Sequence, residues 1–182
     1  MITRCIRQGQ RPLDGRGRFA HHPVMMHSAI RPYRRDDFDT LATLYQRSKG
    51  DEFRFETGWP DRFPVIPLTS DETRLQAFND AEALVLEGEK AALAGVIYWQ
   101  KRHIVGLLVD PQARGKGMGR ALMAAALARM EGQVTLDVVA SNAPAIRLYD
   151  ALYFQRDGQR TGFYQGVPVT LLAMRRDPIG HA

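Results

Sequence analysis

Apolar residues recur along the chain either at helical spacing or in short stretches of strand length. The first pattern predicts helices and the second predicts strands. In the first helical run, four side chains would share one face: Phe38, Leu41, Leu44 and Tyr45. Aspartates precede this run and suit the first turn of a helix. Helical spacing returns in 69–79, in the segment that ends near Met130, and in 144–152. Apolar stretches of strand length occupy 29–33, 83–86, 92–99, 103–109, 134–140, 163–164 and 167–174.

The stretch 103–109 is nearly all apolar, which is typical of a central strand covered on both faces. A helix follows it, and the next strand is 134–140. This connection is long enough for a right-handed crossover between two parallel strands. Tight turns at 88–90 and 101–102 join strands that would instead run antiparallel. We therefore expect an α/β fold built on a mixed sheet.

Composition places the chain among soluble globular proteins. Its 182 residues suit one domain, and 45% of them are apolar and 25% charged. No apolar run reaches the ~18 residues that a membrane span needs, so we expect no membrane partner. The single cysteine excludes an internal disulfide and suits a reducing cytoplasm, where we expect the protein to work.

Most of the positive charge lies near the N-terminus. Residues 1–28 hold five arginines against one aspartate, so that +4 of the net +5 lies there and only +1 in the rest. We expect 1–28 to be a disordered basic leader, 29–177 to be the domain and 178–182 to be a tail. The leader resembles a transit peptide but is poor in serine. The alternative is that the domain begins near Met25 or Met26 and that the leader is a translation-start artefact. Because the rest of the chain has no large excess of basic residues, we expect no nucleic-acid partner.

A glycine-rich segment, Val109–Arg120, lies between an expected strand and an expected helix. The backbone N–H groups of such a turn can bind phosphate oxygens, and a helix N-terminus adds partial positive charge. A dinucleotide-binding fingerprint would need a glycine at Arg120. A P-loop would need a hydroxyl residue after Lys116, where Gly117 stands. Two interpretations remain for this segment: a tight turn, and a pyrophosphate loop of another kind.

An R-x-x-G-x-G pattern, formed by Arg114, Gly117 and Gly119, follows directly after Val-Asp-Pro. It resembles the pyrophosphate loop of the GNAT superfamily of acyl-CoA N-acyltransferases. The order of strand, loop and helix around it agrees with that superfamily.

A second motif of the same superfamily follows the strand 134–140. Asn142, Ala145, Tyr149 and Phe154 match it, in the expected order and separation. Tyr153 departs from the pattern, because the superfamily usually has glycine there and a tyrosine tolerates a positive φ poorly. The resemblance covers roughly residues 29–175.

The resemblance implies a mostly antiparallel mixed sheet with a splayed pair of parallel strands and helices on both faces. It implies acetyl-CoA as the acyl donor, with its pantetheine between the two strands and its pyrophosphate on the glycine loop, and no metal. The residues expected to bind it are Leu107, Leu108, Val109, Arg114, Gly115, Lys116, Gly117, Met118, Gly119, Arg120, Asn142 and Ala145.

Acyl transfer to an amine requires a base and an acid, because an alkylammonium has a pKa near ~10.4 and the thiolate that leaves needs a proton. Tyr149 is the expected general acid; packing in the core is the other interpretation. His103 is a candidate base, since strand alternation would place it on the face of Leu107 and Val109. The other interpretation is that His103 is a strand-end residue exposed at a turn. Water relays could then act as the base.

The acidic and aromatic segment 50–67 lies where the superfamily forms much of its acceptor site. Glu52 and Glu56 are the candidates there for binding a cationic amine, although acidic residues in loops are often only solvated. The resemblance thus indicates an N-acetyltransferase whose partners are acetyl-CoA and an amine acceptor. The alternative is a non-catalytic acyl-CoA-binding module on the same fold. The sequence leaves open whether the protein is a monomer or a homodimer.

Overall fold

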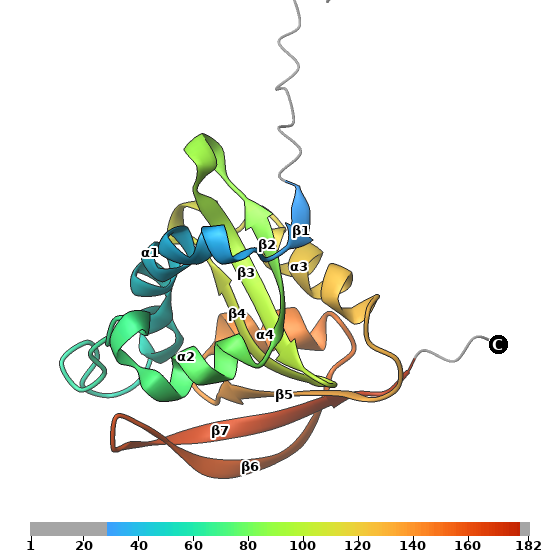
Figure 1. The fold of residues 1–182 in the computed structure, drawn as a ribbon. Coiled ribbons are helices and arrows are strands. Elements are labelled where there is room, and N and C mark those ends of the chain that lie inside the picture. The colour runs from blue at the N-terminus through green and yellow to red at the C-terminus, as the bar shows by residue number, and fades with distance from the viewer. Residues whose placement is uncertain (1–28, 179–182) are drawn as a thin grey trace, which may run out of the picture.

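The computed structural model describes residues 29–178, which form a seven-stranded sheet with helices on both faces (Figure 1). The expected leader, 1–28, and all but the first residue of the expected tail, 178–182, lie outside the described residues. No helix in the described range is long and apolar enough to cross a membrane. The strands are β1 (Ile30–Pro32), β2 (Glu82–Glu87), β3 (Leu93–Gln100), β4 (His103–Val109), β5 (Val134–Val139), β6 (Gln155–Tyr164) and β7 (Val167–Arg176).

The strands follow the order β1-β2-β3-β4-β5-β7-β6, and all neighbours run antiparallel except β4 and β5. This parallel pair is short, because only His103 and Ile104 of β4 pair with Thr135 and Leu136 of β5. Beyond Ile104 the two strands separate. The mixed sheet with a splayed parallel pair is therefore confirmed.

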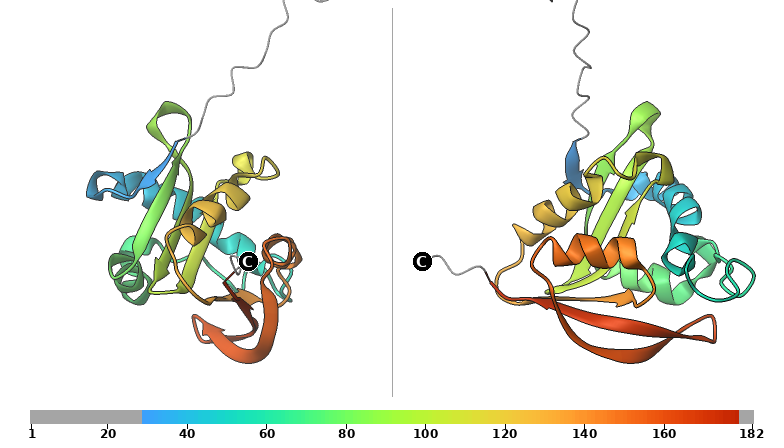
Figure 2. Two further views of the ribbon diagram at one scale, coloured as in Figure 1. Left: turned by 90° about the vertical axis from the view of Figure 1, so that its right-hand side faces the viewer. Right: turned by 180° about the vertical axis from the view of Figure 1, so that it is seen from behind.

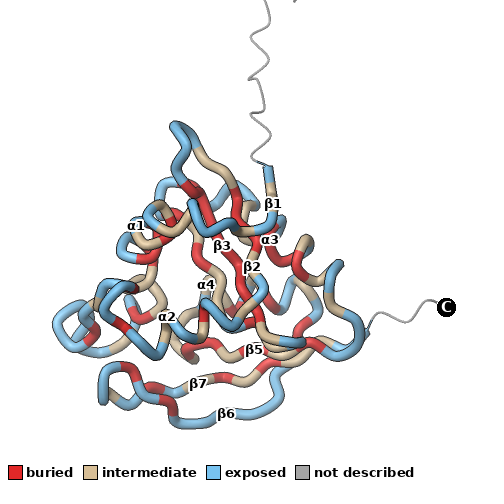
Figure 3. The backbone as a smooth tube through the Cα atoms, viewed as in Figure 1, coloured by how far each residue is buried: buried red, intermediate tan, exposed pale blue. Residues whose placement is uncertain are grey.

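Four α-helices cover the two faces: α1 (Phe38–Ser48), α2 (Glu72–Asn79), α3 (Met118–Leu127) and α4 (Ala143–Asp150). Helices α1 and α2 cover the face seen in Figure 1, and α3 and α4 cover the face seen from behind in Figure 2. Each pair has its own core against the sheet, so β3 and β4 are buried from both sides (Figure 3). That double burial explains why their sequences are almost continuously apolar.

A β-bulge in β4 reverses the alternation of its side chains. Tyr98 of β3 pairs with Gly106, but the next residue, Trp99, pairs with Ile104, so Val105 is an extra residue. As a result Ile104 packs in the α3/α4 core together with Leu107. The expectation that His103 shares a face with Leu107 and Val109 was therefore wrong. The glycine at 106, inside an apolar strand, is the one sequence signal of the irregularity.

The last hairpin is longer than the sequence pattern indicated. We expected only 163–164 before the turn, whereas β6 covers Gln155–Tyr164. Most of β6 is exposed as the edge strand of the sheet, so its first residues are polar and lack alternation. Its pairing with β7 also shifts between Arg156 and Gln159, around Gly158 with φ 118°. A polar edge strand with an irregular register gives little period-two signal.

Tyr153, which replaces the usual glycine of the second motif, ends the α4 region with φ 65°. This is the left-handed conformation that glycine adopts most readily. The tyrosine side chain is 76% exposed, so it meets no packing conflict. The chain therefore keeps the motif's backbone conformation with a non-glycine residue.

Replacing Gly106 by alanine should destabilise the fold, because a Cβ there would overlap Cε1 and Cζ of the Tyr98 ring. We expect urea unfolding to show a loss of about 1–3 kcal/mol, as for other overpacked cores. Gly119→Ala is the matched control, since its Cβ would lie 3.4 Å from the nearest atom, on Leu148, at ordinary contact distance. Equal unfolding midpoints for the two variants would contradict the close packing of Tyr98 on β4.

Candidate active site

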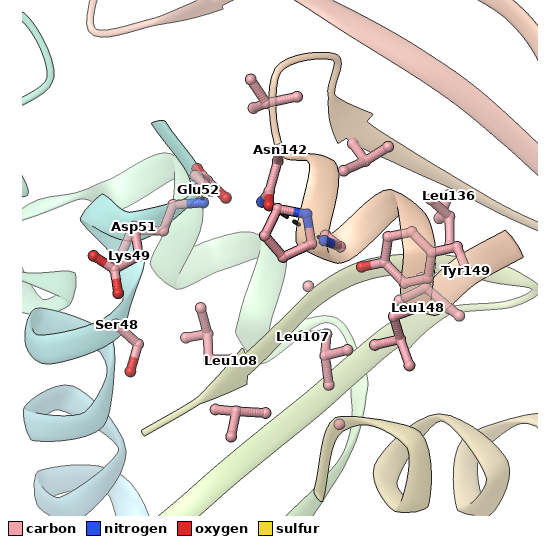
Figure 4. Close-up of a pocket in the computed structure, with 18 of the residues that line it drawn as sticks. Ser48, Lys49, Asp51, Glu52, Leu107, Leu108, Leu136, Asn142, Leu148 and Tyr149 are labelled. Carbon is pink, nitrogen blue, oxygen red and sulfur yellow. Dashed lines mark hydrogen bonds and ion pairs between the residues drawn. The ribbon is translucent and has the colours of Figure 1, made fainter. Parts of the chain in front are cut away.

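A cleft of about 610 Å³ opens where β4 and β5 separate. Its walls come from β4 and β5, the glycine loop, α4, the β6–β7 hairpin, and the 3₁₀ segment Lys49–Phe53 that follows α1. In Figure 4, Tyr149 and Leu148 of α4 lie on one side of the cleft, and Ser48 to Glu52 lie on the other. The expected cofactor residues all line this cleft except Lys116, which is exposed on the loop.

The edge of β4 that faces the cleft has backbone groups without a strand partner. Asp110 N–H donates to the carbonyl of Ala94 at 2.9 Å and so points toward β3. Because N–H directions alternate along a strand, the N–H groups of Val109 and Leu107 point toward the gap. The carbonyl of Val109 does the same, since it accepts a hydrogen bond from Arg114 Nε at 3.1 Å. This edge can therefore pair with an extended ligand that carries amide groups.

The glycine loop presents its backbone N–H groups to the same space. Within the described residues, no N–H group of 114–120 donates to a backbone or side-chain acceptor. Gly115 and Gly117 have φ of 73° and 81°, and no atom lies within 4 Å of where their Cβ atoms would be. Helix α3 begins at Met118, directly after the loop. Free amides at a helix N-terminus are a binding site for an anion such as a pyrophosphate.

The side chain of Arg114 links the loop to the rest of the cleft. Its Nη1 forms an ion pair with Asp51, and its Nε holds the Val109 carbonyl. Arg120 also lines the cleft and has no side-chain partner within the described residues. The loop thus has one arginine held by protein groups and one exposed arginine.

The second motif forms the start of α4. Asn142 caps this helix, since its side-chain oxygen accepts a hydrogen bond from Ala145 N–H at 3.3 Å. Both residues line the cleft, and Pro144 between them does so as well. The asparagine is therefore required locally to begin the helix that positions Tyr149.

The Tyr149 ring is 8% exposed, and its hydroxyl points into the cleft (Figure 4). Burial raises the pKa of this phenol, and the negative charge of Glu52 raises it further. Within the described residues the hydroxyl has no hydrogen-bond partner. A buried, protonated phenol that faces a cavity can act as a general acid.

The two candidate glutamates lie in different places. Glu52 lines the cleft opposite Tyr149, with its carboxylate 2.6 Å from the Lys49 ammonium. Glu56 is not among the residues lining the cleft. Its carboxylate accepts a hydrogen bond from Ser141 Oγ at 2.5 Å, which joins the 50–67 segment to the end of β5.

His103 also lies outside the cleft lining. Its Nδ1 is 2.9 Å from the Thr135 hydroxyl, and its Nε2 is 3.8 Å from the Asp137 carboxylate. The imidazole is 44% exposed. The bulge in β4 explains this placement, because it separates the face of His103 from that of Leu107.

Several cleft residues gave no signal in the sequence. Arg74 comes from α2, and Phe163 and Tyr164 come from the β6–β7 hairpin, all far along the chain from the glycine loop. Nothing in their local patterns indicates a site, since only tertiary packing brings them to the cleft. Within residues 29–178, no group of three or more metal-ligating side chains could hold a metal ion.

Comparison with known proteins agrees with this geometry. The model of the Acetyltransferase (GNAT) family matches residues 39–154, more than half of the chain. The chain is 35% identical over 104 residues to a mycothiol acetyltransferase of Actinosynnema mirum, covering 49% of this chain and 34% of that protein. It is 41% identical over 91 residues to the streptothricin acetyltransferase of Streptomyces lavendulae, covering 46% and 48%. The matches thus span less than half the length of these relatives.

The fold is also that of known structures. The protein yncA of Salmonella typhimurium, solved with its cofactor acetyl-CoA, superposes with a TM-score of 0.59 at 21% identity, over 85% of this chain and 95% of that one. The family match extends from α1 to the end of the second motif and so includes the glycine loop and Tyr149. The chain belongs to the GNAT acetyltransferase family.

Proposed function

We propose that the protein transfers the acetyl group of acetyl-CoA to a primary amine, by direct attack within a ternary complex. The observation that carries the proposal is the pair Tyr149 and Glu52, which face each other across one cleft beside the open edge of β4. One side chain holds a proton and the other can accept one, as amine acylation requires. The structural relative solved with acetyl-CoA supports the choice of donor.

The donor would lie along the cleft with its phosphates at the glycine loop. The free N–H groups of 114–120 and the exposed Arg120 would bind the pyrophosphate. The N–H groups of Leu107 and Val109 would pair with the amides of pantetheine, as a strand would. Asn142 and Ala145 form the opposite wall. Arg114, already held by Asp51, would keep the loop in place.

Acetyl-CoA supplies the acetyl group as a thioester. Glu52 accepts the proton of the incoming ammonium, so that the nitrogen lone pair can form the new C–N bond. Tyr149 donates its proton to the sulfur as the C–S bond breaks. Glu52 takes the base role for which His103 was a candidate, because Glu52 lines the cleft and His103 does not.

A non-catalytic acyl-CoA-binding module on the same fold is the second candidate. It would bind CoA and gain thermal stability from it, but would release no thiol with any amine. The buried phenol favours the enzyme, because binding alone gives no reason to aim its hydroxyl into the cleft. The enzyme and the binding module can be distinguished by measuring thiol release from acetyl-CoA with a broad panel of amines. Only the enzyme should release thiol.

Tyr149→Phe should lower kcat by about 10²-fold or more, the usual contribution of a general acid. CoA binding, measured by calorimetry, should stay unchanged because the ring remains. Tyr45→Phe is the matched control. Tyr45 is equally buried, and its hydroxyl has no partner within the described residues and packs in the α1/α2 core. A similar fall in kcat for both variants would remove the acid role.

The pH dependence of kcat should show no loss of the acid in the ordinary tyrosine range. Burial raises the pKa of Tyr149 above the usual 10.0, so the phenol stays protonated as the pH rises to that value. We expect kcat at saturating amine to hold or rise between about pH 8 and pH 10.0. A descending limb centred within that range, in protein still folded by circular dichroism, would contradict the assignment.

Gly117→Ala should weaken CoA binding about tenfold or more, because a methyl group would enter the space where the phosphate approaches. Gly166→Ala is the matched control. Gly166 has φ 79° against 81° for Gly117, and neither Cβ position has an atom within 4 Å. Both should lose about 1–2 kcal/mol of stability from backbone strain. Only Gly117→Ala should change the CoA affinity, and an equal change in both would contradict the loop's role.

A further inference from the structure

Arg74 lies in the cleft wall with its guanidinium held by two contacts. Its Nη1 donates to Asp71 at 2.6 Å, and its side chain lies 4.7 Å from the centre of the Tyr164 ring. Asp71 is itself held, because its side chain is 6% exposed and caps α2 by accepting from Arg74 N–H at 3.1 Å. Tyr164 is held by donating to the Pro64 carbonyl at 2.9 Å. These contacts hold the arginine in one orientation.

The guanidinium keeps donors available toward the cleft. It carries five N–H groups, and within the described residues the only side chain that accepts a hydrogen bond from them is Asp71, through Nη1. The Arg74 side chain is 26% exposed and lines the cleft, whereas Asp71 lies behind it and is not part of the lining. A planar, pre-oriented fork of this kind matches a carboxylate.

Tyr149, Glu52 and Arg74 line one cleft, and Glu52 faces the phenol across it. Burial raises the pKa values of Tyr149, Tyr98 and Tyr164, and the charge of Glu52 raises all three further. The charge of Arg74 lowers the pKa of Tyr98 and Tyr164. The charge of Glu52 also raises the pKa of Arg74. The cleft thus offers an acid, a carboxylate and a cation.

We propose that the acceptor is an amine that also carries a carboxylate, as an amino acid does, with its amine at Glu52 and its carboxylate on Arg74. The inference rests on the proposed acetyl transfer and names the class of its acceptor. A polyamine is less favoured, because Arg54 lines the cleft together with Arg74. A second ammonium would meet these cations, whereas a carboxylate is attracted to them.

The test compares matched pairs of acceptors, each amino acid against its own amide, by kcat/KM in the thiol-release assay. Arg74→Gln should lower kcat/KM for the acids by about ten- to hundredfold and leave the amides nearly unchanged. Comparing each pair between variant and wild type cancels the different basicity of the two amines. For Arg74→Lys, kcat/KM for the acids should lie between those of the wild type and Arg74→Gln, because lysine keeps the charge and loses the two parallel N–H donors of the guanidinium. Arg62→Gln is the control, because Arg62 is exposed and outside the cleft.

A binding measurement makes the outcome independent of turnover. N-acetyl amino acids and their amides are titrated by calorimetry into the protein saturated with CoA, where we expect the acids to bind more tightly and Arg74→Gln to remove the difference. If amides and acids react equally and Arg74→Gln affects both alike, the carboxylate inference is wrong while acetyl transfer stands. If acids bind through Arg74 but no amine releases thiol, the proposed function fails and the carboxylate site stands. Equal binding of acids and amides overturns the inference in either case.

Discussion

The separation of β4 from β5 beyond Ile104 is the constraint on which the site depends. Paired strands would satisfy each other's amides and leave no space between them. Here two residue pairs hold the strands together at one end, and the opposite end leaves the edge of β4 free. The glycine loop, the start of α4 and the phenol of Tyr149 all surround that gap. A continuous sheet would remove the cleft even if every motif residue were kept.

Packing on both faces of the sheet keeps the gap open. Helices α1 and α2 bury one face of β4, and α3 and α4 bury the other, so β4 is held in place from both sides. The bulge at Val105 adds to this, because it changes the direction of β4 where pairing with β5 stops. Tyr98 lies against Gly106 at the same point and fixes the bulged strand from the side of β3.

Two contacts join the acceptor side of the cleft to the donor side. The ion pair of Asp51 with Arg114 ties the segment after α1 to the glycine loop, and the hydrogen bond from Ser141 to Glu56 ties the next loop to the end of β5. Both pairs join residues that are far apart in sequence, and the first of them lies in the wall of the cleft. The segment that carries Glu52 is thereby placed opposite Tyr149. An acid and a carboxylate from distant parts of the chain can then act on one reacting centre.

The sequence by itself determined the family, the helix and strand order, and the motif residues from Arg114 to Tyr149, because these depend on local patterns: apolar periodicity, glycine spacing and a helix cap. Only the tertiary structure decided which side chains share the cleft. The bulge reversed the face of His103, and the fold brought Arg74 and Tyr164 to the site and turned Glu56 toward Ser141. The physical reason is that these placements follow from strand register and long-range packing, which no local pattern of residues encodes.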